Sequence, residues 1–121
     1  MDCIFCKIID GDIPSYTIYE NEFIKCFLDV NPCSCGHTLI IPKKHFKDIY
    51  DIPLEYLNEI NSAAKKIVSI LDEKLSPNGY KFVQNNGVLQ EVKHYHLHII
   101  PNYNKKNNPS NIEEIYNKLI V

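Results

Sequence analysis

Residues 93–101 read Lys-His-Tyr-His-Leu-His-Ile-Ile-Pro, and this stretch holds three of the chain's five histidines. Side chains alternate between the two faces of a β-strand, so His94, His96 and His98 are expected to project from one face. The other face then carries the apolar residues between and after them, namely Tyr95, Leu97 and Ile99. The pattern predicts a strand that packs on a core with one face and presents three imidazoles on the other.

These three histidines leave several interpretations open. Imidazole titrates near neutral pH, and it can ligate a metal, transfer a proton or act as a nucleophile. Histidine also occurs in ordinary strands without any chemical role. The functional alternatives are a three-histidine metal site, a nucleophilic histidine, a nucleic-acid patch and a pH-sensing surface.

The composition is typical of a single globular domain spanning residues 1–121. Hydrophobic residues make up 45% of the chain, charged residues 23%, and the net charge is −2, which argues against general binding to nucleic acid or to anionic membranes. All thirteen basic residues are lysine. A phosphate site must therefore use histidine, amide, hydroxyl or lysine donors instead of the bidentate guanidinium of arginine.

The segment at the N-terminus suggests a cytoplasmic protein with a metal or redox motif. This segment lacks a basic region followed by a long apolar run, as a signal peptide would have. In the sequence as a whole, no stretch is apolar enough to predict a membrane-spanning helix. The five cysteines are an odd number, as expected for thiols or metal ligands in a reducing compartment. Cys3 and Cys6 have the spacing of half a zinc site or of a redox dithiol, although a redox dithiol is usually preceded by a strand.

The rest of the chain predicts an α+β fold with an antiparallel or mixed sheet of about five strands. Strands are expected over 16–20, 23–29, 37–41, 80–85 and the histidine stretch. Apolar residues at helical spacing predict one long helix from Leu54 to Leu75, with Asp51 as its N-cap. A short helix is expected near the C-terminus, after the polar segment 102–110. Asp29, at a strand end, is either a turn former or a carboxylate that accepts hydrogen bonds from ribose.

Four motifs, taken together, resemble the histidine triad (HIT) family. His-Tyr-His-Leu-His-Ile-Ile at 94–100 matches its His-x-His-x-His signature. Similar stretches are Cys-Ile-Phe-Cys-Lys-Ile-Ile at 3–9, Gly-His-Thr-Leu-Ile-Ile-Pro-Lys-Lys-His at 36–45 and Asn-Asn-Gly at 85–87. The resemblance covers most of the chain, is closest to the bacterial-type and nucleoside-phosphoramidase-like branch, and implies a HIT-like fold with short terminal helices.

The resemblance also implies a function and a set of roles. Such proteins are hydrolases or transferases that act at the α-phosphate of purine nucleotides, often as homodimers. By position, His96 is the expected nucleophile, His98 the donor to phosphate or leaving group, and His94 and His37 their supporting network. The expected substrate contacts are ribose for Asp29 and phosphate for Asn85 and Gln90. The expected ligands of a structural zinc ion are Cys3, Cys6, His45 and His94.

The loop before the triad departs from the family pattern. It is about two residues short, with Leu89 where glycine is expected and Glu91 where serine or threonine is often found. An inward-facing Glu91 would repel a substrate anion. A purine-mononucleotide-binding module with little or no turnover is therefore the alternative to an enzyme.

Overall fold

The computed structural model describes residues 3–104 and 111–120, so most of the expected polar segment 102–110 lies outside the described residues. Five strands form one sheet in the order β1-β2-β3-β5-β4, and every neighbouring pair is antiparallel. They are β1 (Thr17–Glu20), β2 (Ile24–Leu28), β3 (Thr38–Pro42), β4 (Gly79–Val83) and β5 (Leu97–Asn102). The helices are α1 (Ile4–Ile9), α2 (Leu54–Leu75), α3 (Ile112–Ile120) and the short 3-10 helix η1 (Gly87–Leu89). The predicted α+β fold with an antiparallel sheet is confirmed.

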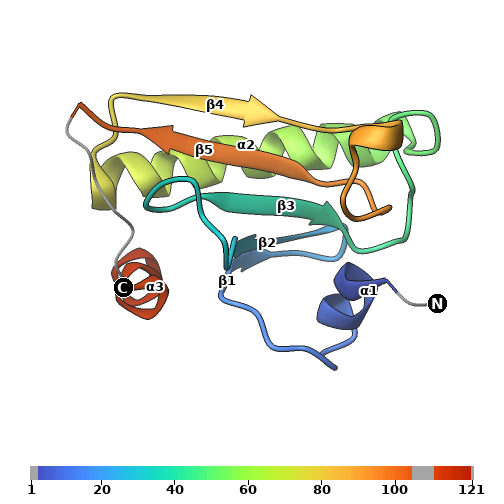
Figure 1. Cartoon of the computed structure of the whole chain (residues 1–121), viewed down its shortest axis with the longest axis horizontal. Helices are drawn as coiled ribbons and strands as arrows, with labels where there is room; N and C mark the ends of the chain where they lie inside the picture. The colour runs from blue at the N-terminus through green and yellow to red at the C-terminus, as the bar shows by residue number, and fades with distance from the viewer. Residues whose placement is uncertain (1–2, 105–110, 121) are drawn as a thin grey trace.

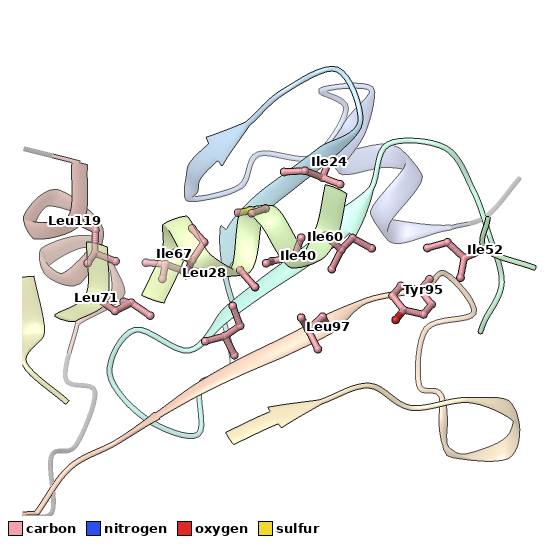
Figure 2. Close-up of a cluster of buried hydrophobic side chains, with 14 residues drawn as sticks. Ile24, Leu28, Ile40, Ile52, Ile60, Ile67, Leu71, Tyr95, Leu97 and Leu119 are labelled. Atoms are coloured by element: carbon pink, nitrogen blue, oxygen red, sulfur yellow. The ribbon is translucent and has the colours of Figure 1, made fainter. Parts of the chain in front are cut away.

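Helix α2 covers one face of the sheet (Figure 1). It buries one apolar stripe at helical spacing, formed by Ile60, Ala63, Ala64, Ile67 and Leu71. This stripe packs against the alternate strand residues that point towards it, including Ile24, Ile40 and Leu97 (Figure 2). The bounds of α2 agree with the predicted helix, but the predicted cap was wrong. Pro53 occupies the N-cap, and the Asp51 carboxylate instead accepts a hydrogen bond from the Lys47 N–H.

The opposite face of the sheet is covered at one end by α1. A second apolar cluster forms there, in which Phe5 and Ile8 of α1 pack with strand residues that include Phe27, Leu39 and Ile41.

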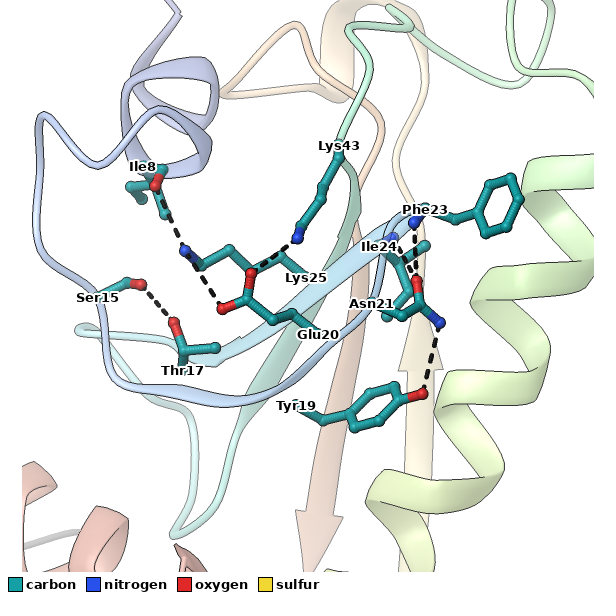
Figure 3. Close-up of polar contacts among 10 residues, drawn as sticks. All are labelled: Ile8, Ser15, Thr17, Tyr19, Glu20, Asn21, Phe23, Ile24, Lys25 and Lys43. Carbon is teal, nitrogen blue, oxygen red and sulfur yellow. Dashed lines mark hydrogen bonds and ion pairs between the residues drawn. The ribbon is translucent and has the colours of Figure 1, made fainter.

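The hairpin between β1 and β2 is closed by Asn21, whose Oδ1 accepts hydrogen bonds from two backbone N–H groups, those of Phe23 and Ile24 (Figure 3). Beyond the part covered by α1, the histidine-bearing face remains open to a cleft.

The histidine strand begins later than the sequence predicts. β5 starts at Leu97, because β3 provides ladder partners only for Leu97, His98 and Ile99, while Ile41 and Pro42 of β3 pair in the ladder only with β2. The preceding segment is held by a loop instead, since the Tyr95 N–H donates to the Phe46 carbonyl over 2.7 Å. The predicted alternation is nevertheless present. Tyr95, Leu97 and Ile99 belong to the core beside α2, and the histidines lie on the other side.

Candidate active site

A cleft of about 640 Å³ lies on the histidine-bearing face, a size typical of small-molecule sites. Its apolar wall includes Phe5 and Ile8 of α1 and Phe27 and Leu28 of β2. Its polar lining includes the predicted residues His96, His98, His37, Asp29 and Asn85. The fold therefore brings most of the predicted catalytic and substrate-binding residues together around one opening.

The protonation of His96 follows from its hydrogen bond. Its Nδ1 lies 2.8 Å from the carbonyl oxygen of His94, and a carbonyl can only accept. The proton of the neutral ring is therefore on Nδ1, and Nε2 keeps a free lone pair. Burial lowers the pKa of His96, although the His94 carbonyl, Asp29 and Glu91 act in the opposite direction. At neutral pH the ring is thus an uncharged base and a potential nucleophile.

A chain of two hydrogen bonds fixes the protonation of His98. The backbone N–H of Cys33 donates to Nδ1 of His37 over 3.0 Å, so the proton of a neutral His37 ring must be on Nε2. That Nε2 lies 3.0 Å from Nδ1 of His98 and donates to it. His98 therefore carries its own proton on Nε2, which makes it a hydrogen-bond donor. Burial, helped by the neighbouring His96 and His37, lowers the pKa of His98 to about 4.

The Asp29 carboxylate closes this network at the end of β2. Its Oδ2 lies 3.5 Å from His37 Nε2 and 4.0 Å from His98 Nδ1, and its Oδ1 accepts the Asn31 N–H. Three potential metal ligands thus meet here. A cation would need a lone pair on His37 Nε2, but the Cys33 N–H keeps the proton on that atom. The geometry favours a hydrogen-bond relay over a metal site.

His94 turns away from the cleft into a second cluster, which Cys3, Cys6 and His45 complete. The His94 Nε2–H donates to the Pro42 carbonyl over 2.9 Å, so Nδ1 offers its lone pair to the cluster. That Nδ1 lies 3.2 Å from His45 Nδ1, 3.4 Å from Cys3 Sγ and 3.6 Å from Cys6 Sγ. Burial is also the main cause that lowers the pKa of His94, to about 4.

These separations match the edges of a tetrahedral metal site. With Zn–N and Zn–S bonds of ordinary length, the edges are about 3.3 Å between two nitrogens and about 3.5 Å between nitrogen and sulfur. The fourth measured edge, 3.3 Å from Cys6 Sγ to His45 Nδ1, fits as well. The predicted ligand set is therefore brought together in a geometry compatible with zinc. The three triad histidines do not converge on one point, and His96 belongs to neither potential ligand group among the described residues.

Gln90 lies in a different environment from the one the sequence suggested. Its side chain is buried, donates to the Lys47 carbonyl over 2.6 Å and accepts the Gly87 N–H over 3.2 Å. It ties the short loop to the segment after His45 and is not among the residues that line the cleft. Glu91, in contrast, does line the cleft. Asn85 is the expected phosphate contact that the cleft exposes.

Some contributors were not foreseen from the sequence. Phe5 places its ring edge-on to His96 with the centroids 5.0 Å apart, and Ile8, one helical turn later, lines the same cleft. Their three-residue spacing was the available signal, because it puts them on one face of a short helix. Lys81 of β4 also lines the cleft and was not foreseen. Other contributors are backbone groups, namely the carbonyls of His94 and Pro42 and the N–H of Cys33, which residue identity does not reveal.

Comparison with known proteins gives consistent relatives. The profile of the HIT domain matches residues 10–105. An uncharacterized HIT-like protein of Methanocaldococcus jannaschii is 48% identical over 103 residues, covering 84% of this chain and 79% of that protein. The adenosine 5'-monophosphoramidase HNT1 of Candida albicans is 45% identical over 105 residues, covering 82% of this chain and 69% of that protein.

The solved structures extend the likeness to the N-terminal segment. A Zn-bound histidine triad family protein from Mycobacterium smegmatis superposes with a TM-score of 0.90 at 35% identity, covering 99% of this chain and 91% of that one. A HIT family protein from Bacillus anthracis gives a TM-score of 0.83 at 42% identity, covering 88% of this chain and 77% of that one.

Within residues 3–104 and 111–120, no helix has the length and apolar character needed to cross a bilayer.

Proposed function

Because this chain belongs to the histidine triad family, we propose that it hydrolyses purine nucleoside phosphoramidates at the α-phosphate through a covalent nucleotidyl-His96 intermediate. The observation that carries the proposal is the hydrogen bond from His96 Nδ1–H to the His94 carbonyl, which leaves Nε2 as a lone pair beside the cleft. The phosphoramidase activity of relatives at 40–45% identity supports the same chemistry.

The proposed reaction has two displacements at phosphorus. In the first, His96 Nε2 forms a bond to the α-phosphorus while the phosphorus–nitrogen bond to the leaving amine breaks, and the departing nitrogen keeps the electron pair and takes a proton from solvent water. In the second, the oxygen of water forms a bond to phosphorus, the bond to His96 breaks with its electron pair returning to Nε2, and the attacking water releases a proton to the solvent. Nδ1 of His96 stays protonated throughout, so the intermediate is an imidazolium stabilised by the His94 carbonyl.

The remaining residues of the cleft take supporting roles. His98, held as an Nε2–H donor, supplies a hydrogen bond to a phosphate oxygen or to the leaving group. Asp29 accepts hydrogen bonds from the ribose hydroxyls, and Asn85 contacts the phosphate. The apolar wall formed by α1 and β2 receives the purine base. Gln90, whose polar atoms already have backbone partners, holds the loop in place.

Glu91 favours an amine leaving group over a polyphosphate. Among the residues that the structure describes, the charged side chains that line the cleft are Asp29, Glu91 and Lys81, and the chain contains no arginine. A dinucleoside polyphosphate would bring several further negative charges into a cleft with two carboxylates and one ammonium group, which costs electrostatic energy. A neutral or cationic amine carries no such cost. We therefore assign the phosphoramidates as the preferred substrates within the family's range.

We propose a structural zinc ion at Cys3, Cys6, His45 and His94. The near-tetrahedral separations support it, as does the Zn-bound relative from Mycobacterium smegmatis. All four positions would be filled by protein, so the ion would hold the N-terminal segment to the triad and would leave no position for substrate.

We also propose that the protein works as a cytoplasmic homodimer. The edge strand β4 exposes half of the Phe82 side chain, and an edge of this kind can pair with a second copy. The free cysteines of the described chain fit a reducing compartment. Light scattering coupled to gel filtration tests the dimer directly, and a monomer at micromolar concentration would contradict it.

A labelled-intermediate experiment tests the proposed reaction. The protein is mixed with adenosine 5'-phosphoramidate labelled at the α-phosphate and quenched in base, because phosphorus–imidazole bonds are labile in acid. Label should be retained on the wild-type protein and absent from His96→Ala. Turnover by His96→Ala would contradict the assigned nucleophile.

The binding module remains the second candidate, and one observation favours it. The short loop uses the Gln90 amide for its own support, which leaves fewer phosphate donors in the cleft. Micromolar binding of adenosine monophosphate, with neither label nor turnover for any amine leaving group, would select this function over the hydrolase.

A further inference from the structure

Helix α1 connects the Cys₂His₂ cluster to the cleft. Its N-cap residue Cys3 and its residue Cys6 supply both thiols of the cluster. On the same six-residue helix, Phe5 and Ile8 line the cleft. A helix this short is not stable in isolation, so its position depends on the side chains that attach it. Any ion that holds the two thiols therefore also positions one wall of the proposed base pocket.

Phe5 makes this connection through direct contacts. Its ring packs edge-on against His94 with the centroids 5.8 Å apart and against His96 with the centroids 5.0 Å apart. The centroid of the same ring lies 5.8 Å from the ring centroid of Phe27, a β2 residue in the apolar wall of the cleft. One side chain thus touches a proposed metal ligand, the proposed nucleophile and the wall of the cleft.

The backbone of His94 provides a second connection. The ring of this residue reaches into the cluster, while its carbonyl oxygen accepts the Nδ1–H of His96. Both groups are buried, and the His94 side chain is fully enclosed. A cation bound at His94 Nδ1 would restrict the residue whose carbonyl orients His96.

We infer that occupancy of the Cys₂His₂ cluster and binding of a nucleotide in the cleft are thermodynamically coupled, with Cys3, Cys6 and His45 as positioning residues. The inference rests on the proposed nucleotide and zinc sites and adds that each ligand tightens the other. Such coupling is reciprocal, because the two affinities are linked through the same states of the protein. Bound zinc must therefore raise the affinity for nucleotide by a certain factor, and bound nucleotide must raise the affinity for zinc by the same factor.

The test measures two affinities on the full chain, without turnover. Calorimetry gives the affinity for adenosine monophosphate of zinc-loaded protein and of protein stripped with a chelator. Competition with a chromophoric chelator gives the zinc affinity with and without saturating adenosine monophosphate. Both should change by the same factor of at least about five. Equal nucleotide affinities within twofold, or unequal factors in the two directions, would overturn the inference.

Two variants separate this coupling from a general loss of stability. Phe5→Ala keeps all four proposed ligands and the His94 connection but removes the contact between α1 and His96, so the coupling factor should fall by at least half. An unchanged factor in Phe5→Ala would overturn the route through Phe5 and would leave the His94 backbone as the connection. Cys26→Ala is the control. It removes a fully buried thiol of β2 from the apolar cluster beneath α2, on the other face of the sheet from both sites, and should leave the coupling factor unchanged.

The failure of this inference differs from the failure of the proposed function. If zinc-loaded protein binds no adenosine monophosphate at all, the nucleotide site itself is contradicted. If it binds equally well with and without zinc, only the coupling is contradicted, and the labelled-intermediate experiment remains the test of the reaction.

Discussion

Replacing His37 with alanine removes the group that sets the protonation of His98. In the intact site, His37 Nε2–H donates to His98 Nδ1 over 3.0 Å, which keeps the His98 proton on Nε2. Without that donor, the nearest partner for His98 Nδ1 is the Asp29 carboxylate, 4.0 Å away. A carboxylate accepts, so it favours the tautomer with the proton on Nδ1. His98 then presents a lone pair to the substrate and can no longer donate to it.

The size of the effect follows from what His98 does in the proposed reaction. Loss of one donor aimed at developing charge costs about 2.7–4 kcal/mol, or 10²–10³ in kcat. If His37 acts only through His98, then His37→Ala should approach His98→Ala, and the double variant should be no slower than His98→Ala alone. His37→Gln retains an amide N–H near the position of Nε2 and should lose less than tenfold.

Steady-state kinetics with adenosine 5'-phosphoramidate measures these differences, and nitrogen-15 NMR of the imidazoles reads the tautomer of His98. The loss should fall on kcat more than on KM, because the donor acts on charge that develops during the reaction. The reasoning is refuted if His37→Ala keeps kcat within threefold of wild type. It is equally refuted if His98 remains protonated on Nε2 in that variant.

Three further perturbations have defined outcomes. Glu91→Gln removes one repulsive charge, so the ratio of kcat/KM for a dinucleoside polyphosphate to kcat/KM for the phosphoramidate should rise by about tenfold. An unchanged ratio would show that Glu91 does not set the preference between these two substrates. Gly36→Ala should lower the free energy of unfolding, measured with urea, by about 2–5 kcal/mol. Gly36 has φ +85°, and a Cβ at this position would lie 2.9 Å from two leucine side chains of α2. The control Gly11→Ala has a similar φ of +84° but open space, so it should cost only about 1–2 kcal/mol. The free energy of unfolding should also fall from pH 7 to pH 5, and His98 accounts for about 2 kcal/mol of this loss. Its pKa is about 4 in the folded chain, whereas the unfolded chain binds the proton near pH 6.5, so a drop in pH favours unfolding. His98→Gln should reduce the loss by that amount and leave the part that comes from His94 and His96.

Periodic apolar patterns predicted most of the fold. The spacing of apolar residues placed α2 at the bounds observed, and the alternation around the triad placed Tyr95 and Leu97 in the core. These predictions succeed because burial of apolar area is the dominant favourable term and imposes its period on the sequence. The start of β5 was missed because the chain before Leu97 is held by the Phe46 carbonyl instead of by β3, and this depends on the position of another segment.

Within the candidate site, residue types were easier to predict than orientations. The four residues of the Cys₂His₂ cluster came together as the family resemblance implied, whereas the spacing of Cys3 and Cys6 alone indicated only half of such a site. The environment of Gln90 could not be predicted, because the hydrogen-bond partners of its side chain are backbone groups of Lys47, Gly87 and Val92. A short loop can direct such a side chain into the cleft or away from it. The same limit applies to the Cys33 N–H, which determines the tautomers of His37 and His98.

The three triad histidines have equal spacing but different chemistry, and the hydrogen-bond partners of their ring nitrogens explain the difference. His94 gives its Nε2–H to Pro42 and keeps Nδ1 free, whereas His96 gives its Nδ1–H to His94 and keeps Nε2 free. The free nitrogens therefore face different sites, one the thiols and the other the cleft. The Gln90 amide is already occupied and the chain contains no arginine, so Lys81 is the one lysine among the described residues that line the cleft. This scarcity of cationic groups supports the proposal of a phosphoramidate substrate, which has one α-phosphate and an uncharged leaving group.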